Sequence, residues 1–234
     1  MALPKVATPK YSLKLPSDGR AVNYRPFLVK EEKILLMAVE SGNEKELSDA
    51  VKTIINNCIE SSDSIDVKTL PVFDIEYLFL NLRAKSVGES VKLKLKCKNE
   101  KCEHECLVGI NLSSVDVTKT EGHDNKIQLT DDIGVIMKYP TFGMLDLPDI
   151  KKNPLKVVNM CIDKIYDSKS VHEAKDSTDE ELSEFVDSLN HLQFEKIQKF
   201  FETMPKMQKT VDFKCDSCLT ENSLTVERLQ DFFE

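Results

Sequence analysis

The sequence predicts an α+β fold, in which helical stretches alternate with separate β-hairpins. One observation is helical spacing of apolar residues, as at Leu47, Val51 and Ile54. A second is the run VKLKLKC at 91–97, which alternates apolar and lysine residues with the period of a strand. The third is a similar run, TVDFKC at 210–215, which also ends in a cysteine. Two matching hairpins are therefore expected far apart in the chain.

The composition is that of an ordinary globular protein. Of the 234 residues, 41% are hydrophobic and 31% charged, and the formal net charge is −8. The sequence has no run of roughly 18 apolar residues, which a membrane span needs. The N-terminal MALPKVATPKYSLKLP has no apolar core of signal-peptide length, which favours a cytoplasmic protein. The acidic balance argues against a general nucleic-acid binder.

Residues 1–88 are expected to form an N-terminal hairpin followed by a helical region. Pro16–Gly19 are residues that favour a turn, and they lie between two short runs of alternating apolar and polar residues. Helices are predicted at about 28–41 and, after a break, around Leu47 to Cys58. Pro71 then begins a third helix, PVFDIEYLFLNLRAKS, because proline is tolerated in a first turn. This helix is apolar on nearly all sides, so it should be buried.

Two cysteine pairs predict a metal site in residues 89–234. Cys97 and Cys102 have four residues between them, and Cys215 and Cys218 have two. This is the spacing of structural zinc sites, and each pair lies at the tip of an alternating hairpin. The pattern is typical of a zinc ribbon, here split into 89–112 and 207–228. Four thiolates would close the coordination shell, so the zinc would be structural rather than catalytic.

Other residues of the first cysteine loop leave the ligand set open. Cys106 shares strand parity with Val108, Ile110 and Leu112, which indicates a core position. His104 is expected in an exposed loop, although either residue could replace a cysteine ligand. Packing positions are expected for Cys58 and Cys161, and surface positions for His123, His172 and His191.

The insertion 113–206 is expected to contain a hairpin and helices. Residues 125–139 suggest the hairpin, 155–165 look helical, and the polar stretch 168–181 suggests a loop. Two helices are then marked by apolar stripes that begin at Leu182 and Phe194. A short helix, ERLQDFFE at 227–234, would close the chain.

No pattern predicts catalysis or a small-molecule substrate. The acid clusters Asp131-Asp132 and DSTDEELSEF suit a turn and a helix start, and the sequence has no Gly-rich phosphate loop or nucleophile motif. A row of lysines is exposed on one strand and its loop, without the aromatic residues that stack bases. Its members are Lys92, Lys94, Lys96, Lys98 and Lys101. We therefore expect a non-enzymatic protein without catalytic residues.

Four features together resemble the baseplate hub assembly proteins of T4-type contractile-tailed bacteriophages. They are LPKVATPKY, YRPFLVKEEKILLMAVES, LPVFDIEYLFLNLRAKSVGE and the split cysteine loops. The resemblance implies a structural or assembly role in building the hub of the tail baseplate. It implies other baseplate hub and tail proteins as partners, in the host bacterial cytoplasm during assembly, with the virion baseplate as a further location. The alternative is a zinc-ribbon module that binds nucleic acid or acts in transcription.

Overall fold

The structure, a computed structural model, describes residues 6–60, 65–147, 150 and 153–227. These residues form helices and small antiparallel sheets, which confirms the predicted α+β class. They divide into two compact units. Unit 1 takes in the described residues of Met1–Val67, Phe73–Thr118 and Lys206–Glu234, and unit 2 those of Lys68–Val72 and Lys119–Pro205.

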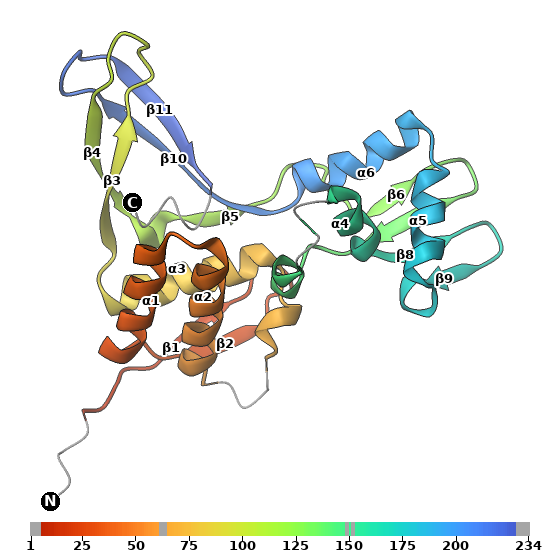
Figure 1. The fold of residues 1–234 in the computed structure, drawn as a ribbon, viewed down its shortest axis with the longest axis horizontal. Coiled ribbons are helices and arrows are strands. Elements are labelled where there is room, and N and C mark those ends of the chain that lie inside the picture. Colours follow the sequence, from red (N-terminus) through yellow and green to blue (C-terminus); the bar gives the residue numbers. More distant parts are fainter. Residues whose placement is uncertain (1–5, 61–64, 148–149, 151–152, 228–234) are drawn as a thin grey trace, which may run out of the picture. The chain divides into compact units, whose positions relative to one another are not determined.

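Unit 1 combines helices with antiparallel hairpins (Figure 1). Strands β1 and β2 pair first, β3 pairs with β4, and a further sheet has the order β11-β10-β5. The strands are β1 (Tyr11–Lys14), β2 (Ala21–Tyr24), β3 (Ser90–Lys96), β4 (Glu105–Asn111), β5 (Asp116–Thr118), β10 (Lys206–Lys214) and β11 (Glu221–Val226). The helices are α1 (Val29–Ser41), α2 (Glu44–Cys58), α3 (Val72–Ser86) and the 3₁₀ turn η2 (Leu112–Ser114), and the turn η1 (Val67–Thr69) begins in this unit.

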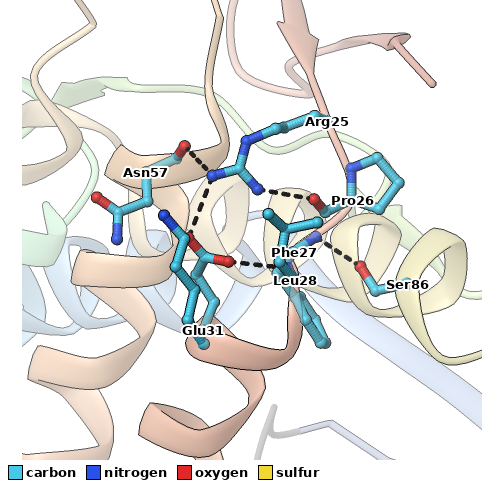
Figure 2. Close-up of polar contacts among 8 residues, drawn as sticks. Arg25, Pro26, Phe27, Leu28, Glu31, Asn57 and Ser86 are labelled. Atoms are coloured by element: carbon cyan, nitrogen blue, oxygen red, sulfur yellow. Dashed lines mark hydrogen bonds and ion pairs between the residues drawn. The ribbon is translucent and has the colours of Figure 1, made fainter. Parts of the chain in front are cut away.

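A buried ion pair fixes the start of α1 (Figure 2). The Glu31 carboxylate, with no exposed surface, accepts a hydrogen bond of 2.8 Å from the Leu28 N–H, a donor that the helix itself leaves without a partner. Arg25 donates to the same carboxylate at 3.1 Å. Arg25 also donates to the carbonyl of Asn57 at 2.8 Å, near the end of α2. One guanidinium therefore joins the start of α1 to the end of α2.

The end of α3 is tied to the same segment. The Phe27 N–H donates to the Ser86 Oγ at 2.9 Å (Figure 2). This hydroxyl donates to the Leu82 carbonyl at 2.6 Å. At the start of α3, buried Asp74 accepts hydrogen bonds from the backbone N–H and the hydroxyl of Ser17, in the turn between β1 and β2. These contacts hold the N-terminal hairpin and three helices as one body.

Helix α3 is buried along most of its length, as its apolar sequence predicts. Its C-terminal half shares a hydrophobic core with both distant hairpins. The members of this core are Leu80, Ala84, Leu93, Ile110, Leu112, Val115, Met207, Val211 and Val226. Burial of these side chains holds β3–β4 and β10–β11 on the same helix.

Unit 2 contains an antiparallel sheet of order β6-β7-β8-β9 and helices that share one core. The strands are β6 (Lys126–Gln128), β7 (Gly134–Met137), β8 (Ile162–Tyr166) and β9 (Val171–Glu173). The helices are α4 (Pro154–Cys161), α5 (Asp179–Asp187), α6 (His191–Thr203) and the 3₁₀ turns η3 (Phe142–Asp146) and η4 (Ala174–Asp176). The core contains Ile127, Leu129, Val135, Met137, Met144, Val158, Cys161, Ile162, Ala174, Leu182, Val186, Ile197 and Phe200.

Two local predictions within this unit were wrong. The helix predicted at 155–165 ends at Cys161, and Ile162 begins strand β8. The tertiary pairing with β7 explains this change, since β-branched Ile162 and Ile165 suit a sheet. The stretch predicted as a loop at 168–181 contains β9, which pairs with β8. Of the short helix predicted at 227–234, all but Glu227 lies outside the described residues.

The predicted surface position of His123 was also wrong, because its exposure is only 8%. Its Nδ1 lies 2.9 Å from the Thr203 Oγ1, and its Nε2 lies 3.2 Å from the Tyr139 hydroxyl. The ring also contacts the rings of Tyr139 and Phe200. His123 lies near the start of the insertion and Thr203 near its end. The histidine therefore joins the two ends of unit 2.

Replacing Glu31 with Gln should lower the free energy of unfolding by about 3 kcal/mol. The substitution leaves the Arg25 guanidinium, itself largely buried, without its carboxylate partner. Glu32→Gln makes the same charge change one residue later on α1 and is the matched control. Urea unfolding followed by circular dichroism would measure both, and equal effects would contradict the assigned role of the ion pair.

The stability of unit 2 should fall as the pH drops below about 6.5, the ordinary pKa of histidine. Burial lowers the pKa of His123 in the folded chain. The nearby Lys119 charge lowers this pKa further, and the Asp124 charge opposes the change. The unfolded chain therefore takes up this proton first, and the stabilisation is lost as the pH falls through the folded pKa. Urea unfolding from pH 5 to 7 should show a shallower pH dependence in His123→Gln. An unchanged slope would contradict this assignment.

Candidate metal centre

The loops of hairpins β3–β4 and β10–β11 lie at the same end of unit 1 (Figure 1). β3 and β4 pair from Ser90–Asn111 to Lys96–Glu105, immediately before Cys97. β10 and β11 pair as far as Lys214–Glu221, immediately before Cys215. Each cysteine pair therefore begins where a strand ladder ends, as the hairpin pattern predicts.

The structure brings the four predicted cysteines together, and we call them the four-cysteine cluster: Cys97, Cys102, Cys215 and Cys218. Their sulfur atoms all lie within 4.8 Å of one another. The Sγ atoms of Cys97 and Cys218 are 3.6 Å apart, and those of Cys102 and Cys215 are 3.8 Å apart. Each close pair joins one loop to the other. Cysteines that lie 121 and 113 positions apart in the sequence thus meet at one point.

Backbone N–H groups point at the sulfur atoms in a repeated pattern. The Asn99 N–H donates to the Cys97 Sγ at 3.5 Å. In the same way, each of the other sulfurs accepts a hydrogen bond from the N–H two residues later. These pairs are Cys102 with His104, Cys215 with Ser217, and Cys218 with Thr220. Such donors favour the thiolate form, which is the form that binds metal.

The thiols differ in acidity because they share hydrogen bonds. The Thr220 hydroxyl and N–H lower the pKa of Cys218 to about 6, and the thiols of Cys102 and Cys215 act in the same direction. The His104 N–H lowers the pKa of Cys102, but the Cys218 thiol, burial and the Cys215 thiol outweigh it and raise this pKa to about 11. The shared hydrogen bonds thus lower the pKa of Cys218 and Cys215 and raise that of Cys102.

Polar side chains hold the two cysteine loops against each other. Asn222, only 4% exposed, accepts a hydrogen bond from the Lys98 N–H at 2.8 Å and donates to the Thr220 carbonyl at 2.8 Å. Asn99 donates to the Thr220 Oγ1 at 3.4 Å. Sequence reasoning missed these residues. Their signal was the presence of Asn and Thr two to four residues after a cysteine, in loops where such side chains commonly bond to the backbone.

The donor set fits a zinc ion. A tetrahedral site with Zn–S bonds of about 2.3 Å places its sulfurs about 3.8 Å apart. The Cys97–Cys218 and Cys102–Cys215 sulfur separations, 3.6 Å and 3.8 Å, match this value. Two of the six sulfur–sulfur separations in the cluster are therefore those that four thiolate ligands have around zinc, and the other four are at most 4.8 Å.

The remaining candidates lie outside the four-cysteine cluster. Cys106 is 2% exposed and His104 is exposed, as predicted. Cys58 and Cys161 are fully buried, which agrees with the expected packing role. Burial raises the pKa of Cys58 to about 11 and that of Cys161 to about 12, so both remain thiols at neutral pH.

Comparison with protein families gives a match over nearly the whole chain. The family model described as "T4 bacteriophage base plate protein" matches residues 8–234. The chain belongs to this baseplate family. Comparison with curated proteins and with solved structures returned no significant match.

Membership of the baseplate family confirms the resemblance seen in the sequence. It identifies the protein as a structural component of the phage tail baseplate, with other phage tail proteins as partners. It also favours a non-enzymatic role. None of the helices in the described residues has the length and apolar character needed to cross a membrane.

Proposed function

We propose that this baseplate protein promotes assembly of the baseplate hub, without covalent chemistry, in the cytoplasm of the infected bacterium. The family match across residues 8–234 is the observation that supports this role. The protein would act by presenting rigid surfaces to other hub and tail proteins. In this proposal Cys97, Cys102, Cys215 and Cys218 hold a structural zinc ion that keeps those surfaces in place.

A structural role for the zinc follows from the number of donors. Four sulfur atoms within 4.8 Å of one another would fill a tetrahedral shell and leave no position for a substrate or an activated water. When bound, the ion would crosslink the two loops by bonds to both. Because zinc-bound cysteines lose their protons, binding releases protons and should weaken as the pH falls.

The proposed domain organisation follows from the same pairing. Residues 89–112 and 207–228 would act as one zinc-ribbon-like module, with 113–206 as an insertion and 1–88 as the N-terminal part. The antiparallel pairing of β5 with β10 supports the return of the chain to the module, because Thr118 lies opposite Lys206. The core shared by α3 and the hairpins supports close association of the N-terminal part with the module.

A second candidate function is a zinc-ribbon module that binds nucleic acid. The exposed lysines on one face of β3, Lys92, Lys94 and Lys96, favour it. The net charge of −8 argues against it, because phosphate binding depends on concentrated positive charge. Tight, salt-sensitive binding in a gel-shift assay would support this alternative.

The zinc site predicts that Cys215→Ser loses the metal. Wild-type protein purified under reducing conditions should carry zinc in the four-cysteine cluster, measured by mass spectrometry. Zinc-finger peptides gain roughly 10–16 kcal/mol of apparent binding energy from such sites, so its loss should speed amide hydrogen exchange throughout β10 and β11. The matched control is Cys58→Ser, which alters a buried thiol outside the cluster. Equal zinc content in Cys215→Ser and wild type would contradict the assignment.

The assembly role predicts capture of phage tail proteins. Affinity-tagged protein, recovered from infected cells during tail assembly, should retain hub or tail proteins identifiable by mass spectrometry. Cys215→Ser should retain fewer, and Cys58→Ser should behave as wild type. Recovery of polymerase or ribosomal proteins in place of tail proteins would contradict the proposal and favour the nucleic-acid alternative.

A further inference from the structure

Three other potential ligands meet beside the four-cysteine cluster. One donor atom each from His104, Cys106 and Asp216 lies within 4.8 Å of the other two. They offer an imidazole nitrogen, a thiol sulfur and a carboxylate oxygen. His104 and Asp216 are exposed, whereas Cys106 is buried. The group thus has one buried soft donor and two polar donors that are open to solvent.

The backbone of the ribbon holds these three residues in place. The His104 carbonyl accepts a hydrogen bond of 3.1 Å from the Cys97 N–H, which continues the pairing of β3 with β4. Cys106 lies within β4, opposite Leu95. Asp216 follows Cys215 directly, and its N–H hydrogen-bonds to the Cys106 sulfur. That hydrogen bond joins β4 to the second cysteine loop, and the Cys106 thiol also hydrogen-bonds to the Cys215 thiol, so the group borders the four-cysteine cluster.

We propose that His104, Cys106 and Asp216 form a second metal site, for a borderline divalent ion such as Zn²⁺ or Co²⁺. Imidazole, thiolate and carboxylate are all established ligands of zinc, and the mixture disfavours Mg²⁺ and Ca²⁺, which prefer oxygen donors. Three protein ligands leave a fourth position open. A water molecule or a donor side chain of a bound protein can occupy it.

This site differs in kind from the closed four-cysteine cluster. A four-thiolate shell has no room for an outside ligand, whereas the second site reaches the surface through two exposed side chains. Its ion would be bound more weakly, because the protein supplies fewer ligands. The second site goes beyond the proposed structural zinc, and the two are separable because they share no residue among the described ligand groups.

Cobalt titration of the reduced, metal-free full-length protein tests the site. Co²⁺ reports its ligands through charge-transfer and d–d absorption bands, so the two sites can be followed separately. We expect two equivalents of Co²⁺ per chain, the tighter one with the absorption of a four-thiolate site. His104→Ala and Asp216→Asn should each lose the second equivalent and keep the first.

Matched variants control for general effects of substitution. His172→Ala and Asp212→Asn remove an exposed histidine and an exposed aspartate elsewhere, and both should bind two equivalents. Cys106→Ala should lose the second equivalent, whereas Cys58→Ala, which also removes a buried thiol from unit 1, should keep both.

Three results would overturn the second site. Wild-type protein could saturate at one equivalent, or the second equivalent could persist in both His104→Ala and Asp216→Asn. Alternatively, His104→Ala could change the spectrum of the first equivalent, which would place His104 in the four-cysteine site. A missing first equivalent in wild type would instead count against the proposed structural zinc.

Discussion

Unit 1 depends on bringing together two cysteine loops that lie far apart in the chain. Cys102 and Cys215 are 113 positions apart, yet their sulfurs approach to 3.8 Å. Closing a flexible loop of this length costs about 4 kcal/mol beyond a constant term. That cost is a large part of the 5–15 kcal/mol that stabilises a typical domain. Contacts other than the thiols must therefore help to hold the two segments together.

The folded insertion supplies some of these contacts. The chain leaves unit 1 after Thr118 and returns at Lys206, and these two residues lie opposite each other in the β5–β10 pairing. Within unit 2, His123 and Thr203 form a hydrogen bond close to the same two chain ends. Once unit 2 folds, its ends are already close, so the effective loop to be closed is short. The core on α3 then fixes both hairpins through apolar contacts.

The sequence predicted the structure best where the pattern lies within one segment, as in the alternation of side chains along a strand and the spacing of two cysteines in one loop. Strand parity correctly predicted that Cys106 is buried, and CxxC spacing located the second cysteine loop. Tertiary pairing decided the positions that were missed: β8 replaced part of a predicted helix because β7 offers it a partner. The contacts of Asp216 and Asn222 could not be predicted from their neighbours in the sequence, because they involve residues of the other hairpin more than a hundred positions away.

In the proposed function, a metal ion and not a disulfide joins the two cysteine loops. If the protein acts in the bacterial cytoplasm, as we propose, glutathione and thioredoxin would keep the thiols reduced, so a disulfide across this junction would not persist. The proposed four-thiolate zinc site would be stable under those conditions and would join both loops through one ion, whereas a disulfide joins only two residues. The backbone donors already aimed at each sulfur reduce the cost of holding four thiolates together. In the proposed function, the end of unit 1 that carries the two cysteine loops would thus be its most rigid part, as a surface that promotes hub assembly requires.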